Sequence, residues 1–145
     1  MRVVLFIIGV LALVSLVLVG EAWVRFAPLD AAQLHRVSGP ETAGDWPEKG
    51  GFTAVLAVPD AQAALTSVVA IAQAAPRTRV LAGEVGAGHI SLVTRTPFWG
   101  FPDVTNIWVA EERLHVSGHL VYGRSDFGVN RDRVEGWLRA AGLRE

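Results

Sequence analysis

Hydrophobic and polar positions divide the chain into an apolar N-terminal segment and a mixed remainder. Residues 3–20 carry no charge, and Ser15 is their only polar side chain. Eighteen such residues reach the lower limit for a helix that crosses a bilayer. Trp23 follows the run, and tryptophan is typical of the membrane–water interface. The pattern therefore predicts a transmembrane anchor over residues 1–26.

A cleaved signal peptide is the alternative interpretation of this segment. Its apolar core is usually about 7–15 residues long and ends at a site of small residues. Gly20 and Ala22 stand at suitable positions for such a site, but the apolar core is longer than usual. Length therefore favours the uncleaved anchor.

The orientation of the anchor is weakly encoded, because Arg2 precedes the apolar run and Arg25 follows it. Basic residues on both sides give no clear direction by the positive-inside rule. A very short N-terminal tail before a larger domain is typical of a tail that stays in the cytoplasm. We expect a single-pass protein of the bacterial inner (cytoplasmic) membrane with an extracytoplasmic domain.

Residues 27–51 are rich in proline and glycine and have neither helical nor strand periodicity. Such composition predicts a mostly extended linker. Periodic patterns begin at residue 52, so the globular domain is predicted over residues 52–145.

Apolar runs and alternating patterns predict five strands within this domain, at residues 52–58, 78–85, 89–95, 103–110 and 113–122. Apolar residues at three- and four-residue spacing predict two helices, at residues 59–75 and 131–142. The order is β-α-β-β-β-β-α, and no helix separates the later strands. The sheet should therefore be largely antiparallel and the fold class α+β.

Side chains in the last predicted strand alternate between two kinds, which suits a sheet with one face on the core and the other facing water. One face carries Leu114, Val116, Leu120 and Tyr122, and the other carries His115, Ser117, His119 and Val121.

Composition excludes several kinds of chemistry. The chain has no cysteine, so disulfides, thiolate nucleophiles and iron–sulfur clusters are absent. Its net charge of −1 gives no overall field that would attract nucleic acid. His115 and His119 share a strand face but stand about 13 Å apart, too far for one metal ion. We expect no metal, no cofactor and no nucleic-acid partner, with the histidines at the surface or in hairpins.

The stretch "GRSDFGVNRDR", residues 123–133, is the most polar motif in the chain. Its second half is predicted to start the last helix. Asn130 is the expected N-cap, Asp132 lies in the first turn, and Val129 with Val134 forms a hydrophobic staple.

The remaining part of this stretch centres on Arg124, Ser125 and Asp126. In the structural interpretation, Asp126 binds local backbone N–H groups or pairs with a nearby arginine and holds the turn. In the functional interpretation, free N–H groups and arginines form an anion site. The candidate turn network or anion site comprises Arg124, Ser125, Asp126, Asn130, Arg131 and Arg133. Turn networks are the commoner of the two arrangements.

A second candidate surface is the aromatic loop "TPFWGFPD", residues 96–103, which contains Phe98, Trp99, Phe101 and Asp103. This loop folds onto the open end of the core, dips into a membrane, or covers a ligand pocket. Exposed aromatic clusters usually mark contact surfaces, so the loop is a candidate contact site.

These motifs resemble the domain of unknown function 1499 family. Gly123, Ser125-Asp126, Gly128–Arg131 and Arg133 are similar to its terminal pattern G-x-S-D-x-G-V-N-R-x-R, and "FWGFPDVTNI" resembles its aromatic segment. The likeness covers about residues 55–138. Leu120 and Val121 stand where many members carry a Ser-Arg pair. The resemblance implies a bacterial or plastid domain and no established reaction.

The anchor and the lack of a complete catalytic constellation lead us to expect a non-enzymatic, envelope-associated binding module, with no catalytic residue assigned. Its partner would be an envelope protein or a lipid. The alternatives are a hydrolase-like enzyme on an anionic envelope substrate, with Asp126 as acid/base and the arginines as clamps, and a small lipid-binding pocket protein.

Overall fold

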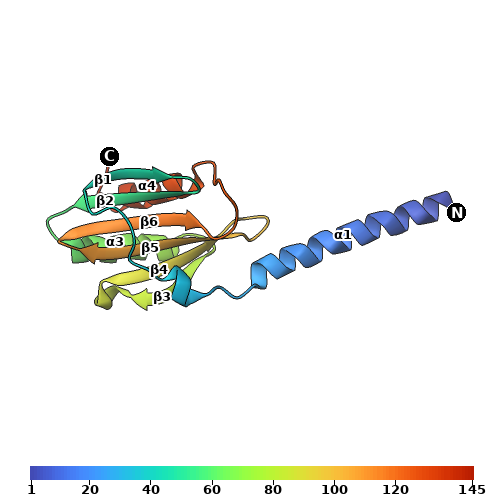
Figure 1. The fold of residues 1–145 in the computed structure, drawn as a ribbon, viewed down its shortest axis with the longest axis horizontal. Coiled ribbons are helices and arrows are strands. Elements are labelled where there is room, and N and C mark those ends of the chain that lie inside the picture. The colour runs from blue at the N-terminus through green and yellow to red at the C-terminus, as the bar shows by residue number, and fades with distance from the viewer.

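The computed structural model describes residues 1–145 and contains the predicted helices and strands with some additions (Figure 1). The helices are α1 (Arg2–Phe26), α2 (Ala31–Leu34), α3 (Ala61–Ala74) and α4 (Val129–Ala140), with a 3-10 turn η1 (Val85–Ala87). The strands are β1 (Gly44–Glu48), β2 (Gly51–Ala57), β3 (Thr78–Glu84), β4 (His89–Arg95), β5 (Pro102–Ala110) and β6 (Arg113–Leu120).

The strands form one antiparallel sheet in the order β1-β2-β6-β5-β4-β3, which confirms the α+β class. The sheet has six strands where about five were predicted. The additional strand, β1, lies inside the segment predicted as an extended linker, so that interpretation is wrong for its last part. Every residue of β1 is exposed, and Pro47 has no backbone N–H to donate to a neighbouring strand. Proline is tolerated on an edge strand, where one side of the backbone needs no partner, and such a strand lacks the alternation that marks buried ones.

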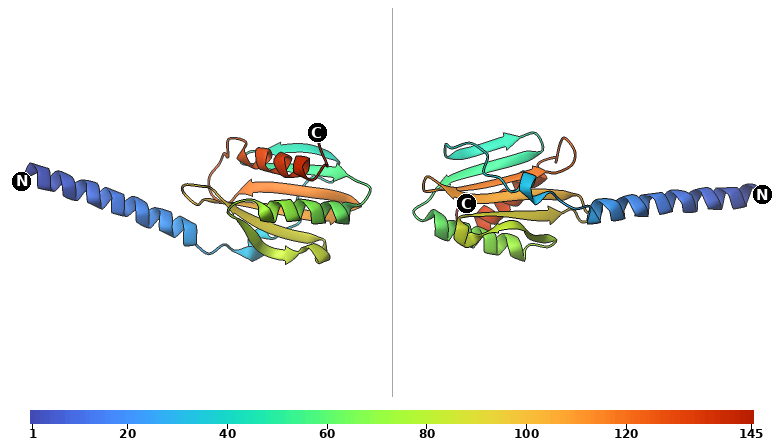
Figure 2. Two further views of the ribbon diagram at one scale, coloured as in Figure 1. Left: turned by 180° about the vertical axis from the view of Figure 1, so that it is seen from behind. Right: turned by 60° about the horizontal axis from the view of Figure 1, so that its bottom comes forward.

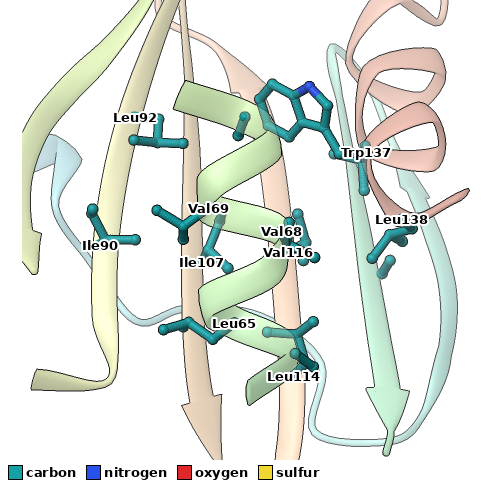
Figure 3. Close-up of a cluster of buried hydrophobic side chains, with 14 of the residues drawn as sticks. Leu65, Val68, Val69, Ile90, Leu92, Ile107, Leu114, Val116, Trp137 and Leu138 are labelled. Atoms are coloured by element: carbon teal, nitrogen blue, oxygen red, sulfur yellow. The ribbon is translucent and has the colours of Figure 1, made fainter. Parts of the chain in front are cut away.

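Helices α3 and α4 cover one face of the sheet and enclose the core (Figures 2 and 3). Leu65 and Val68 of α3 and Leu138 of α4 are fully buried there. Asp60 caps α3 by accepting a hydrogen bond from the Ala63 backbone N–H at 2.8 Å. The spacing of apolar residues thus locates both helices correctly, because their buried stripes face the sheet.

The opposite face of the sheet is covered by residues 34–43, which we call the strap (Figure 2). The prediction that this face meets water is therefore wrong. His115, on β6, is only 3% exposed. Hydrophobic periodicity indicates only strands and helices. The strap is an irregular segment without such periodicity, so the sequence pattern could not show that it covers this face.

Helix α1 projects away from the domain, and none of its residues is buried (Figure 1). It is the one helix long and apolar enough to cross a membrane by length and composition, and it lies near the N-terminus. Its uncharged run, residues 3–20, is about 27 Å long at 1.5 Å per residue, close to the roughly 30 Å of a bilayer's hydrocarbon core.

Candidate functional site

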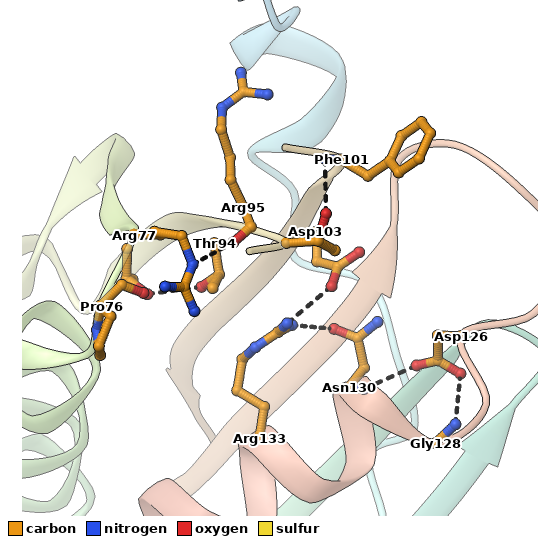
Figure 4. Close-up of polar contacts among 12 residues, drawn as sticks. Pro76, Arg77, Thr94, Arg95, Phe101, Asp103, Asp126, Gly128, Asn130 and Arg133 are labelled. Carbon is orange, nitrogen blue, oxygen red and sulfur yellow. Dashed lines mark hydrogen bonds and ion pairs between the residues drawn. The ribbon is translucent and has the colours of Figure 1, made fainter. Parts of the chain in front are cut away.

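The turn before α4 is held by the carboxylate of Asp126 (Figure 4). Its two oxygens accept hydrogen bonds from the backbone N–H groups of Gly128, at 3.2 Å, and Asn130, at 2.9 Å. Burial disfavours the charged carboxylate, but these hydrogen bonds outweigh that effect and hold the pKa of Asp126 below its usual range. Asp126 therefore satisfies free donors at the start of the helix and forms no ion pair with an arginine.

Asn130 is not the N-cap. The capping position is Gly128, whose φ of 86° suits glycine, and Asn130 lies one residue inside α4 with its side chain fully buried. The predicted staple is also wrong, because Val129 is already helical and is exposed. The Asp126 carboxylate accepts the free N–H groups at the start of α4, as the Asn130 side chain was expected to do. The Asn130 side-chain amide therefore contacts Arg133 instead.

Arg133 joins α4 to the sheet through two hydrogen bonds (Figure 4). One nitrogen donates to Asn130 Oδ1 at 2.7 Å and another to Asp103 Oδ2 at 2.9 Å. The Asp103 residue is 1% exposed, so this is a buried ion pair. Burial raises the pKa of Asp103, and the hydrogen bond and charge of Arg133 offset only part of that rise.

The other residues of the motif stay outside this network. Arg131 is exposed, pairs with Glu135 at 2.7 Å and lies over the ring of Phe52. Ser125 Oγ accepts a long hydrogen bond from the Phe127 N–H at 3.5 Å, and Arg124 is exposed and forms no side-chain hydrogen bond. The structure therefore brings together Asp103, Asn130 and Arg133, but not the whole predicted set.

A cleft of about 440 Å³ lies beside this network, between the aromatic loop and the turn before α4. Its lining includes Asp103, Asp126 and the mostly apolar residues Phe101, Leu120, Tyr122, Phe127 and Val129. The second carboxylate oxygen of Asp103 has no hydrogen-bond partner although it is buried. Figure 4 shows that oxygen directed away from Arg133, on the side of Phe101. Buried carboxylate oxygens normally have partners, and the protein itself leaves this one unsatisfied.

Two further buried polar atoms near this carboxylate lack partners, Thr105 Oγ1 and Asn130 Nδ2. Asp103 and Thr105 lie two residues apart on β5 and so share the face that α4 covers. Gly118 lies opposite Thr105, and a Cβ there would approach Asn130 Oδ1 to 3.1 Å. Glycine at this position lets the start of α4 reach the sheet.

The aromatic loop is docked on the last turn of α1. Arg25 donates to the Phe98 carbonyl at 3.1 Å, and Arg95 donates to the carbonyls of Val24 at 3.1 Å and Gly100 at 2.8 Å. Phe98 is 70% exposed and Trp99 44% exposed. The loop therefore does not close over the core, and its aromatic tip lies beside the end of α1.

All four histidines gather at the covered face of the sheet, which the sequence did not indicate: His89, His115 and His119 lie on its strands, and His35 belongs to the strap. His35 stacks on His89, with ring centroids 3.8 Å apart, and its Nδ1 lies 2.7 Å from Ser91 Oγ. His115 stacks on Trp108 at 4.7 Å. Burial lowers the pKa values of His89, His115 and His119, and the charge of His35 lowers that of His89 further. His115 is buried, so the expectation of surface or hairpin histidines is wrong for that residue; His89 begins β4 just after the β3–β4 turn, and His35, His89 and His119 are half-buried.

Polar residues fill the centre of this covered face. Thr53, Ser117, Asn106 and Ser91 are neighbours across four strands, and the Thr53 and Ser117 hydroxyls are 2.8 Å apart. Ser91 also donates to Asn106, whose side-chain oxygen accepts the Arg36 backbone N–H at 3.3 Å. One signal was present in the sequence: polar residues recur at every second position of several strands, and their register lines them up. No group of three or more potential metal ligands gathers here or elsewhere in the molecule.

These features define an α+β domain that carries one N-terminal helix of membrane-spanning length and a polar signature at the junction of its last strand and last helix. The chain belongs to the family described as protein of unknown function (DUF1499), whose profile matches residues 34–141. The match begins at the strap and includes β1, so the family unit is larger than residues 55–138. No curated protein shows significant similarity to the chain.

Proposed function

We propose that this protein is a membrane-anchored binding module whose cleft holds an amphiphilic ligand. The observation that carries the proposal is the buried, unpartnered oxygen of Asp103, a residue that lines a mostly apolar cleft. An apolar wall with a few placed polar groups is the usual composition of a small-molecule site. The ligand would place a hydroxyl or amine donor on Asp103 and its apolar part against Phe101 and Tyr122.

The position of the cleft supports a ligand drawn from the membrane. Its lining includes Thr96 and Phe101 of the aromatic loop, and the same loop is bonded to the last turn of α1. The cleft therefore lies close to the last turn of α1, and Figure 1 shows α1 leaving the domain at one end. If α1 is embedded as an uncleaved anchor in the bacterial inner membrane, a lipid or lipid-linked envelope component reaches the cleft without crossing much water.

Enzymatic use of Asp126 finds no support in this geometry. Both of its oxygens already accept backbone N–H groups and its pKa is lowered, so it holds no proton to donate near neutral pH and is a weak base. Asp126 is better explained as a structural residue of the turn.

Native mass spectrometry of the full chain, purified in a mild detergent, tests the cleft. We expect an additional mass from a co-purified amphiphile. The Asp103→Asn variant should keep its amide oxygen on Arg133 and present an NH₂ group to the cleft, so the acceptor is lost. Hydrogen bonds to charged groups contribute about 1.5–3 kcal/mol, so affinity should fall roughly tenfold to hundredfold.

The matched control is Asp132→Asn, which removes a carboxylate from the exposed first turn of α4. It should retain the ligand. A ligand-free mass for the unmodified protein across independent preparations would reject the proposal, and so would equal loss from both variants.

The membrane topology of the proposal has its own test. A C-terminal reporter enzyme that is active only outside the cytoplasm should be active when fused to Glu145, and the full chain should resist extraction from membranes by alkaline carbonate. Activity confined to a cytoplasmic reporter would reverse the orientation, and release by carbonate would remove the anchor.

A further inference from the structure

Four arginines from three parts of the chain surround a second cleft, of about 520 Å³, where α1 meets the domain. Arg25 is in the last turn of α1, Arg77 immediately precedes β3, Arg79 is the second residue of β3, and Arg95 ends β4. The rest of the lining is Thr78 and the segment from Phe26 to Leu29. No acidic residue lines this cleft.

The positive charge of this group, the arginine cleft, is mostly uncompensated. Glu21 pairs with Arg25 at 2.8 Å. Asp30 is the next nearest acid along the chain, and its Oδ1 accepts the backbone N–H groups of Ala32 and Gln33. Four arginines therefore line the cleft, and Glu21 is the one acid that forms an ion pair with any of them, in a chain whose overall net charge is −1. This local excess of positive charge arises because the tertiary structure brings the four arginines together, and the net charge of the whole chain does not reveal it.

The arginines differ in how far they are committed to structural contacts. Arg25 and Arg95 hold the aromatic loop and α1 together through carbonyl groups. The Arg77 side chain donates one hydrogen bond, to the Arg95 carbonyl at 3.1 Å, and the Arg79 side chain forms no hydrogen bond or ion pair. Burial lowers the pKa of Arg95, and the positive charge of Arg79 lowers it further, because these groups lie close enough to repel each other. An anion between them would relieve that repulsion.

The cleft lies at the level expected for lipid headgroups. The uncharged run of α1 ends at Gly20 and matches the hydrocarbon thickness, so Arg25 falls one turn beyond the apolar core. Trp23, Phe26 and Phe98 are exposed around the same junction. Aromatic side chains in a ring beside basic ones are typical of the membrane interface.

We propose that the arginine cleft binds the phosphate of an anionic phospholipid and so fixes the domain against the membrane surface. Guanidinium groups recognise phosphate oxygens through paired hydrogen bonds, and several basic residues near a membrane strengthen its attraction for anionic lipid. The inference rests on the proposed embedding of α1, and it is independent of the ligand proposed for the Asp103 cleft.

The test uses the full chain in detergent micelles, titrated with phosphatidylglycerol or phosphatidylcholine and followed by native mass spectrometry. Phosphatidylglycerol should bind more tightly. Arg79→Gln should weaken it about fivefold, and Arg77→Gln with Arg79→Gln roughly 25-fold, since each basic residue near an anionic lipid surface contributes a similar free energy. The matched control is Arg131→Gln with Arg139→Gln, which removes the same charge from the exposed face of α4 and should leave binding unchanged.

Each result supports or rejects the lipid site. If the cleft variants and the control variant lose equal affinity for phosphatidylglycerol, the lipid is attracted by overall positive charge, and the proposed site is rejected. If inorganic phosphate displaces phosphatidylglycerol and binds as tightly as the lipid does, the cleft is a site for a soluble anion instead. Asp103→Asn should keep phosphatidylglycerol binding, and the double arginine variant should keep the amphiphile of the other cleft, so failure of one proposal is distinguishable from failure of the other.

Discussion

Replacing Arg133 by alanine should destabilise the domain by about 3–5 kcal/mol, the usual loss when one partner of a buried ion pair is removed. The substitution leaves the Asp103 carboxylate buried without its cation and leaves Asn130 Oδ1 without its donor. Chemical denaturation of the full chain in a mild detergent, followed by tryptophan fluorescence, measures the change. Trp137 is buried in the core and reports on it.

The loss of folding stability in the Arg133→Ala variant should depend on pH. Burial already raises the pKa of Asp103 in the presence of Arg133, and without the guanidinium the rise should be larger. A carboxyl that holds its proton more tightly in the folded state contributes stability at low pH, and that contribution disappears as pH rises through the folded pKa. The variant should therefore be closer to the unmodified protein at pH 5 than at pH 8.

Arg139→Ala is the matched control, because Arg139 lies on the same helix, is exposed, and pairs with Glu135 at 3.5 Å. Surface pairs contribute less than about 1 kcal/mol. If Arg133→Ala costs no more than Arg139→Ala, the buried pair is not the link between α4 and the sheet.

Replacing Gly83 by alanine should destabilise the domain by about 2–5 kcal/mol and loosen the strap. Gly83 has a φ of +78°, which costs an L-residue about 1–2 kcal/mol. A Cβ there would also collide with the His89 carbonyl oxygen and come within 2.6 Å of His35 Cε1, and such overpacking typically costs about 1–3 kcal/mol. The His35 ring would have to leave its stack on His89.

Two measurements separate strap release from general instability. Denaturation gives the free energy, and hydrogen exchange at the Arg36 amide reports the bond to Asn106 that holds the strap. Gly86→Ala is the control in the same hairpin, since no atom lies within 4 Å of its Cβ position. Unchanged exchange at Arg36 in the Gly83 variant would show that the strap does not depend on this contact.

Several elements could be predicted from sequence because their signals are local. Val68 and Leu65 recur at helical spacing in α3, and the strand over residues 103–110 has the length and apolar content of a buried strand. The edge strand β1 carries no such signal. Its pairing depends on the neighbouring β2 and not on its own side chains, so periodicity could not reveal it.

In the polar motif over residues 123–133, too, local sequence patterns could not reveal contacts between residues far apart in the chain. Composition identified a polar turn before the last helix, and Asp126 does bind local N–H groups. The role of Asn130 could not be found this way. Its partners are Arg133 on its own helix and, through Arg133, Asp103 on β5, about thirty residues earlier in the chain. Capping rules describe neighbours in sequence, whereas this side chain is used in a contact between a helix and a sheet.

By itself, the sequence determined the long apolar N-terminal helix, the antiparallel α+β class and the family. Each follows from patterns within some twenty residues or from a contiguous motif, and hydrophobic burial acts on those patterns wherever they occur. Only the tertiary structure decided that the strap covers the histidine face, that Asp103 is buried beside a cleft, and that four arginines converge at the end of α1. Those arrangements join residues far apart in the chain, and their energies come from packing and electrostatics that exist only once the sheet has formed.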